Sequence, residues 1–580
     1  MNSVARQMIW KQLNCIGGIR TITTFTRFHE YLSIRRQQAV KSLLIQVTNL
    51  NSAQEVRTYL QSNFGPLQAL YHYSIPKKGK GASVPSPVSS QTSGDYHWLL
   101  AEFEDPQSAR ECIAKCRHAD GTLPFNSSMC WYRQPKSSKK QRRQKVDDGV
   151  AAEDEFPEIF SERLEGQTSP PDYRKVKTLS EQLKVLEASS KLSELGIRAR
   201  FFVASQLELA FANLFPRGCV LPFGSTVSGI GRQSGDLDLV LVPDSSEIFT
   251  ETDANNNAEL LGGGKEGDDG RLYYQSKLFT ANSSNARFQA QRVMETMADV
   301  IQLFVPGCTH VQRILQARVP ILRFWSEFTD LQCDLSMTNA SGVHMSELIY
   351  IMSQLEPRFP TLLFAIRSWA SARKITNPVP GRQPTNFMFV LLLIYFLQKR
   401  QLLPTLDILF NNAGIKDQRV TVDGIDCSFL RDKEQIMKHF SPQTQGESAA
   451  ELLFDFFEFY SEFDFNSKGV SLVTGSSWGK PDTGPLYIQN PLERHLNVAR
   501  NVSKEEVIRF KSECCSALWK LETSWNSIHH SDKNSSTSGS SSPTLHDLLL
   551  TPTLDSGSSS RSPGASAQDQ RFQIKELFTK

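Results

Sequence analysis

The 580-residue sequence lacks any apolar run long enough to cross a membrane as a helix. Such a helix needs about 20 consecutive apolar residues, and the best candidate, Phe387 to Leu397, is too short. We therefore expect no membrane-spanning helix. The apolar run from Phe387 to Leu397 instead indicates a helix that is buried in a protein core.

Paired cysteines are also absent. Ten cysteines are scattered along the chain without CxxC spacing, so neither a zinc ribbon nor a disulfide framework is indicated. The net charge of +3 is too small to indicate nucleic-acid binding by itself. Hydrophobic residues make up 39% of the chain, an ordinary globular value. At about 100–200 residues per domain, the length predicts two or three folded units.

Acidic residues are nearly missing from the first 41 positions. This segment holds seven lysines and arginines against one acid, Glu30. Ile9, Leu13 and Ile16 fall on one face of a helix if the segment is helical. An arginine-rich, acid-poor, amphipathic start is typical of a mitochondrial transit peptide, which predicts a mitochondrial matrix protein. The alternative is a disordered basic N-terminus.

Residues 42–133 have the pattern of a small βαββαβ unit, which resembles an RNA-recognition motif with its ferredoxin-like fold. That fold binds RNA by stacking bases on aromatic side chains of its central strands. Here Gln46 and Leu100 occupy the positions of those aromatics. The pattern favours a structural or dimerisation role over base recognition. Residues 134–175 follow as a charged linker.

The rest of the chain divides by composition. Residues 176–340 alternate helical and strand patterns, interrupted at 243–285 by a polar, glycine-rich stretch that predicts a solvated insertion. Residues 341–526 are mostly helical by period. Residues 527–580 form a serine-rich tail, which is typical of disorder because it offers little apolar surface to bury.

Two carboxylates stand on one face of a predicted strand. In Asp236-Leu237-Asp238, residues i and i+2 point the same way, while the leucines that follow point into a core. Asp334 lies mid-strand on the polar face of a second alternating segment, where an aspartate is otherwise unfavourable. Three converging carboxylates would repel one another unless a cation lies between them. Their oxygens suit Mg²⁺ or Mn²⁺.

A Gly-Ser turn precedes the first aspartate pair. Gly224 permits a close backbone approach to a ligand, and Ser225 offers a hydroxyl and an N–H to a phosphate. The joint pattern of Gly-Ser, a ten-residue gap, Asp-x-Asp and a distant aspartate resembles the DNA polymerase β-like nucleotidyltransferase superfamily. That resemblance implies an α+β fold with a mixed-sheet palm. It also implies two-metal nucleotidyl transfer in which Asp236, Asp238 and Asp334 are catalytic.

The C-terminal half resembles the poly(A) and terminal uridylyl polymerases of that superfamily, in particular the mitochondrial poly(A) polymerases. This resemblance covers about residues 178–510 and implies adenylate addition from ATP to RNA 3′ ends. It also implies a homodimer that forms through the RNA-recognition-like domain, and a mainly helical poly(A)-polymerase-associated domain. By the same match, the nucleotide contacts are Phe223, Gly224, Ser225, Arg367, Arg373, Lys374, Asn386, Phe387, Asn490 and Asn497.

Two alternatives stay open. Uridylyl enzymes usually place a histidine directly before the residue that matches Asn497, and here that residue is Leu496. This favours ATP over UTP, but a terminal uridylyltransferase or an oligoadenylating relative would share the rest of the pattern. The second alternative is a catalytically degenerate scaffold that binds RNA, against which the presence of all three aspartates argues.

Overall fold

The computed structural model describes most of the chain in twelve pieces. These are residues 27–48, 52–76, 95–115, 128–132, 159–161, 176, 178–243, 286–337, 339–377, 381–443, 446–530 and 545. The apolar face expected at Ile9, Leu13 and Ile16 and nearly all of the insertion expected at 243–285 lie outside the described residues. Within the described ranges, no helix is both long and apolar enough to cross a membrane.

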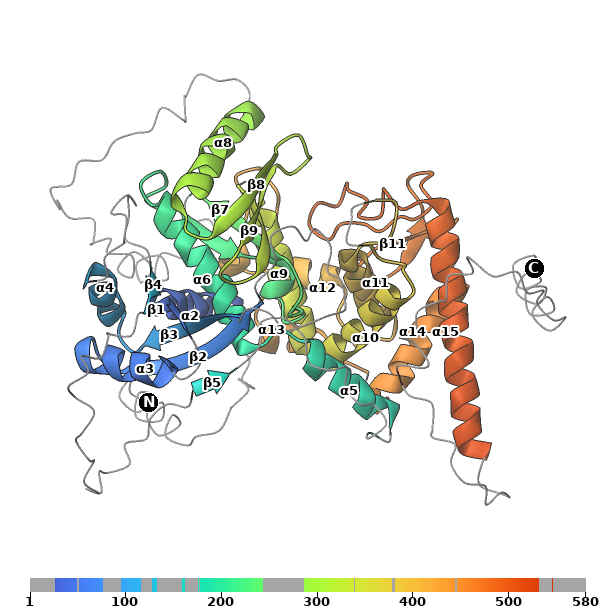
Figure 1. Ribbon diagram of the computed structural model, residues 1–580. Coiled ribbons are helices and arrows are strands. Elements are labelled where there is room, and N and C mark those ends of the chain that lie inside the picture. Colours follow the sequence, from blue (N-terminus) through green and yellow to red (C-terminus); the bar gives the residue numbers. More distant parts are fainter. Residues whose placement is uncertain are drawn as a thin grey trace, which may run out of the picture.

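A five-stranded sheet forms the N-terminal part, on the blue side of Figure 1. It has the βαββαβ order expected from the sequence and the strand order β4-β1-β3-β2-β5. The outermost strand, β5, lies in the segment expected to be a linker, and it pairs with β2. β4 runs parallel to β1, whereas the resemblance to an RNA-recognition motif predicts an antiparallel pair. The elements are β1 (Ser42–Val47), α3 (Ser52–Asn63), β2 (Leu67–Ile75), β3 (Tyr96–Phe103), α4 (Pro106–Lys115), β4 (Met129–Trp131) and β5 (Ile159–Ser161).

Both faces of this sheet are buried. One face packs on α3 and α4 through residues such as Leu99 and Phe103. The opposite face, which includes Tyr73 and Trp98, packs on α6 (Glu194–Phe211) and Phe328. The second face is the one on which an RNA-recognition motif would stack bases. It is unavailable for that purpose here, which agrees with a structural role for this part of the chain.

The helix α2 (Phe28–Val40) lies within residues 1–41, the segment that the sequence predicts to be a leader. Its residues Phe28 and Leu32 are buried. Arg36 forms a buried ion pair with Glu208 of α6, with 2.8 Å between Nη2 and Oε1. The composition that resembles a leader therefore belongs in part to a folded helix, whose arginines have carboxylate partners far along the chain.

The palm is a second mixed sheet with the order β6-β7-β10-β9-β8. β7 and β10 are parallel, and the other neighbours are antiparallel. Helices α6 and α8 cover the apolar face of the sheet. The opposite face is covered by α2 and α9 at its β6 side. The palm elements are β6 (Cys219–Pro222), η2 (Gly224–Thr226), β7 (Leu237–Val242), α8 (Ala286–Phe304), β8 (Cys308–Ile314), β9 (Ile321–Ser326) and β10 (Leu331–Ser336).

A helical half completes the molecule, on the yellow-to-red side of Figure 1. Its largest core is built around α11, which contains the apolar run expected to be a core helix. The helix α5 (Leu179–Ser190) precedes the palm in sequence but packs here, against α10 and α14. The other elements are α9 (Ala340–Leu355), α10 (Phe359–Ala372), α11 (Asn386–Lys399), α12 (Leu406–Asn411), η4 (Ile415–Asp417), α13 (Lys433–His439), α14 (Ala449–Glu462), β11 (Lys468–Val470), β12 (Ser477–Gly479) and α15 (Lys504–His530).

The described residues of the serine-rich tail are the end of α15, up to His530, and Leu545. Leu545 is fully buried in the core of the helical half. Its backbone N–H donates a hydrogen bond to Gln182 Oε1 of α5 at 2.6 Å. In the sequence Leu545 begins a short apolar pattern, Leu545-His-Asp-Leu-Leu-Leu550, but the serine-rich composition of the tail as a whole did not reveal this contact.

We expect Leu545→Ala to lower the free energy of unfolding by about 2–5 kcal/mol, because truncating a buried leucine leaves a cavity in a packed core. Denaturant titration of the full chain measures this change. The matched control is Leu303→Ala, since Leu303 is 66% exposed on α8. If both variants unfolded at the same denaturant concentration, the tail contact would contribute nothing.

Candidate active site

Neighbouring parallel strands place two of the predicted carboxylates side by side. Asp238 of β7 and Asp334 of β10 are direct partners in the strand register. Asp236 immediately precedes β7, so it shares the face of Asp238. Leu237 and Leu239 point to the opposite face, where both are fully buried. The structure therefore brings the three aspartates to one face of the palm sheet.

Burial and neighbouring charges raise the pKa of two of the three carboxylates. Burial, together with the negative charges of Asp334 and Asp236, raises the pKa of Asp238 to about 7. The pKa of Asp236 is raised by burial and then by the charge of Asp334. Because the ionised forms are disfavoured, this face attracts a cation.

Arg323 supplies a cation within the chain. Its guanidinium donates two hydrogen bonds to Asp334, from Nε to Oδ1 at 2.8 Å and from Nη2 to Oδ2 at 2.7 Å. The two residues face each other across the antiparallel pair β9–β10. Both oxygens of Asp334 are thus engaged. The described residues contain no group of three acidic, histidine or cysteine side chains close enough to hold a metal ion.

Sequence reasoning did not assign a role to Arg323. A signal was available, because Arg323 interrupts the apolar residues of Ile321–Ser326 at a position that alternates with buried Leu322 and Phe324. What the sequence could not supply was the pairing of β9 with β10, which sets Arg323 opposite Asp334.

The Gly-Ser turn lies directly against the aspartates. Gly224 has a φ of +68°, and a Cβ there would lie 2.9 Å from Asp238 Oδ2. Only glycine tolerates both the backbone angle and the close approach. The Gly224 N–H donates a hydrogen bond to Ser346 Oγ at 2.7 Å, which ties the turn to α9. Within the described part of the chain, the Ser225 hydroxyl makes no hydrogen bond, so it is available to a phosphate.

Comparisons with known proteins place this geometry in a family. Residues 179–354 match the model of the central palm domain of mitochondrial-like poly(A) RNA polymerases, and residues 448–496 match that of the Cid1 family poly(A) polymerases. The mitochondrial poly(A) RNA polymerase of Drosophila melanogaster is 36% identical over 506 residues, covering 86% of this chain and 76% of that protein. This chain belongs to the mitochondrial poly(A) RNA polymerase family.

Two further relatives agree with this membership of the poly(A) RNA polymerase family. The mitochondrial poly(A) RNA polymerase of Mus musculus is 30% identical, covering 92% of this chain and 83% of that protein. A crystal structure of mtPAP in complex with ATPγS superposes with a TM-score of 0.66 at 28% identity, covering 86% of this chain and 95% of that one. The same protein has been solved with CTP, GTP and UTP.

Three basic residues of this chain, Arg367, Arg373 and Lys374, are expected to contact nucleotide, and in the structure the two arginines pair with groups of the protein. Arg367 is buried, and its Nη1 donates to the Ile230 carbonyl at 2.9 Å. Burial and the charge of Arg232 lower its pKa to about 9. Arg373 lies 3.6 Å from Glu513 of α15, between Nε and Oε2. Lys374 follows with a left-handed φ of 54°. A phosphate contact by these three residues remains a prediction.

Four of the remaining expected contacts, all except Phe223, lie in the helical half of the chain. Asn386 is exposed and begins α11, and Phe387 is half-buried against the core. Asn490 Oδ1 accepts hydrogen bonds from the N–H groups of Leu492 and Glu493, each at 3.0 Å.

Asn497 is braced in a similar way. Its Oδ1 accepts from the Ile488 N–H at 3.1 Å, and its Nδ2 donates to the Leu486 carbonyl at 2.9 Å. Asn490 and Asn497 thus shape the segment that the family match assigns to nucleotide recognition, and a direct contact of either with nucleotide remains a prediction. Phe223 packs against the palm core near Gly342, beside the Gly-Ser turn, and its contact with nucleotide stays a prediction.

Proposed function

We propose that this chain is a mitochondrial polynucleotide adenylyltransferase, which adds adenylates from ATP to RNA 3′ ends without a template. The observation that carries this function is the set of three aspartates on one sheet face beside the Gly224–Ser225 turn. Membership of the poly(A) RNA polymerase family gives that arrangement its chemistry. Relatives with this family name act in mitochondria, and the name supports the same location here.

The donor set fits a hard divalent cation. Asp236, Asp238 and Asp334 would hold Mg²⁺ or Mn²⁺, since carboxylate oxygens suit both ions and the mutual repulsion of the three groups favours a cation between them. When bound, such ions supply positive charge next to the reacting phosphate and lower the pKa of the RNA 3′-hydroxyl. For Asp334 to take part, the guanidinium of Arg323 must give up at least one of its two hydrogen bonds.

The chain's own groups position the reactants. Ser225, with its unengaged hydroxyl, would bind the triphosphate beside Asp238. Asp334 lies on the strand next to Asp238 and would be nearest the attacking 3′-oxygen of the RNA. Asn386 at the exposed start of α11 would add a contact to the triphosphate, because the N-terminal end of a helix favours anions, and Phe387 would stack on the base.

The N-terminal sheet is best understood as a degenerate relative of the RNA-recognition motif that has a structural role. Its base-stacking face is occupied by α6, so it would support the palm and a homodimer rather than read bases. A leader peptide would have to be cleaved before α2, because removing Phe28–Val40 would leave Glu208 without its buried partner.

Nucleotide choice tests the proposed function. The purified chain is incubated with a labelled single-stranded RNA and each of the four NTPs, with a chelator as control. We expect ATP to extend the RNA at least about ten-fold faster than UTP, equivalent to about 1.4 kcal/mol in the transition state. A preference for UTP of that size would make the chain a uridylyltransferase. No extension with any nucleotide would make it a scaffold.

A further inference from the structure

The turn between β9 and β10 joins the two strands that carry Arg323 and Asp334. Its tip is held from outside the palm, by the N-terminal sheet. The Tyr73 hydroxyl of β2 donates a hydrogen bond to the Phe328 carbonyl at 2.7 Å. Tyr73 is 1% exposed, so this bond is shielded from water. A contact far along the chain therefore fixes the backbone of a turn that leads directly into the catalytic strand.

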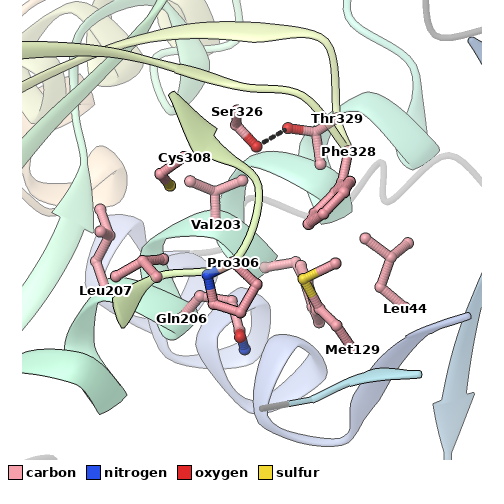
Figure 2. Close-up of a pocket in the computed structure, with 12 residues that line it drawn as sticks. Leu44, Met129, Val203, Gln206, Leu207, Pro306, Cys308, Ser326, Phe328 and Thr329 are labelled. Carbon is pink, nitrogen blue, oxygen red and sulfur yellow. Dashed lines mark hydrogen bonds between the residues drawn. The ribbon is translucent and has the colours of Figure 1, made fainter. Parts of the chain in front are cut away.

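The Phe328 ring is clamped on two sides. The ring of Trp98, from β3 of the N-terminal sheet, lies 4.8 Å from it, centroid to centroid. On another side is Gly307, where a Cβ would come within 2.1 Å of the Phe328 ring. The ring can occupy this position only because residue 307 has no side chain. Figure 2 shows Phe328 in the seam between the palm and the N-terminal residues Leu44 and Met129.

The turn itself has little freedom to absorb movement. The hydroxyls of Ser326 and Thr329 are hydrogen-bonded at 2.7 Å, as Figure 2 shows. The Glu327 N–H donates to the Gly307 carbonyl at 2.8 Å. Asp330 has a left-handed φ of 51°, an angle that few residues other than glycine adopt. A displacement of the Phe328 backbone would therefore also shift β10. Asp334 lies in that strand, only a few residues after the turn, and a strand rises by about 3.3 Å per residue.

We propose that the N-terminal sheet positions the third carboxylate of the active site through this turn, with Tyr73 as the positioning residue. The inference rests on the proposed function, since it gives Asp334 a catalytic task. Tyr73 touches neither nucleotide nor RNA. It acts through the Phe328 carbonyl and the β9–β10 hairpin, and it holds Asp334 and Arg323 in register with Asp238.

The test is Tyr73→Phe, which removes the hydroxyl and keeps the ring. The lost hydrogen bond is expected to lower kcat by about three- to ten-fold, with the KM for ATP within about two-fold of the unmodified chain because Tyr73 is remote from the triphosphate. The matched control is Tyr132→Phe, since the Tyr132 hydroxyl lies 3.4 Å from Glu55 Oε2 within the N-terminal part. Equal kcat in the two variants would overturn the proposal, as would a rise in KM without a change in kcat.

Hydrogen exchange supplies a readout that is independent of activity. Tyr73→Phe should speed exchange at the amides of residues 327–336 more than elsewhere in the palm, and Tyr132→Phe should not. A uniform rise across the palm would mean only a general loss of stability, against the proposal. Size and mass in solution should match the unmodified chain, because each variant keeps its ring and loses a single hydrogen bond.

A double-mutant cycle with Phe328→Leu tests whether the two contacts act together. Leucine keeps the turn apolar but loses the ring contact with Trp98. If both residues act through one turn, the combined effect on log kcat should be smaller than the sum of the single effects. Additive effects on log kcat would contradict the claim that Tyr73 and Phe328 act through the same turn. If the unmodified chain failed to extend RNA with any of the four nucleotides, the proposed function would fail. If it extended RNA normally and the Tyr73 and Phe328 variants did so equally well, only this inference would fail.

Discussion

Asp238→Asn is expected to reduce RNA extension by at least about 100- to 1,000-fold. Asparagine keeps the size of the side chain but removes the charge that a divalent cation requires. The same change should not lower stability in a chelator at pH 8. Asp238 has a pKa of about 7 because its ionised form is disfavoured by burial and by Asp334 and Asp236. Above that pH the ionised carboxylate costs stability, and a neutral amide relieves that cost.

Loss of activity without loss of stability is the signature that separates a catalytic carboxylate from a structural one. Extension of labelled RNA and chemical unfolding in EDTA are measured on the same preparation. Asp299→Asn is the control, because Asp299 is 64% exposed on α8 and pairs with Arg313 at 2.6 Å, away from the three aspartates. If Asp238→Asn kept more than about a tenth of the activity, the proposed metal site would be wrong.

Strand alternation explains why the aspartates could be predicted from sequence. A two-residue period sends Asp236 and Asp238 to one face and the intervening leucines to the other. Asp334 followed from the same rule applied to a separate segment. The rule does not say which strands are neighbours, so it could not show that Asp238 and Asp334 are register partners. The resemblance to a known superfamily implied that the three aspartates converge, and the structure supplied the register.

Long-range partners account for what the sequence did not reveal. The pairing of β9 with β10 places Arg323 opposite Asp334. The Phe328 carbonyl accepts a hydrogen bond from Tyr73, which lies 255 positions earlier in the chain. The arginines of α2 look like leader charges by composition, yet Arg36 neutralises a carboxylate 172 positions away. Composition shows that a charged side chain is present, but it does not show which group that side chain contacts. The same limit hid the burial of Leu545 in a polar tail.

Arg323→Met should destabilise the chain without metal and increase its response to metal. Methionine keeps an apolar stem but leaves the Asp334 carboxylate without its two hydrogen bonds, next to two like charges. In EDTA we expect the unfolding free energy to fall by about 1–3 kcal/mol, with the melting temperature falling by about 2–4 °C for each kcal/mol in a domain of this size. Mn²⁺ should then raise the melting temperature more than in the unmodified chain, because no guanidinium competes for Asp334.

Thermal melts with and without Mn²⁺, in the absence of nucleotide and RNA, measure both effects. Arg318→Met is the matched control, since Arg318 is 47% exposed and pairs with Glu493 at 3.2 Å, outside the aspartate cluster. An equal Mn²⁺ response in the Arg323 variant and the unmodified chain would show that the ion does not reach Asp334. A larger response that disappears when Asp334→Asn is added would show that arginine and metal compete for one carboxylate. The ion pair would then be the resting state of the site, in which Arg323 keeps the cluster neutral enough to fold until a metal and a nucleotide arrive.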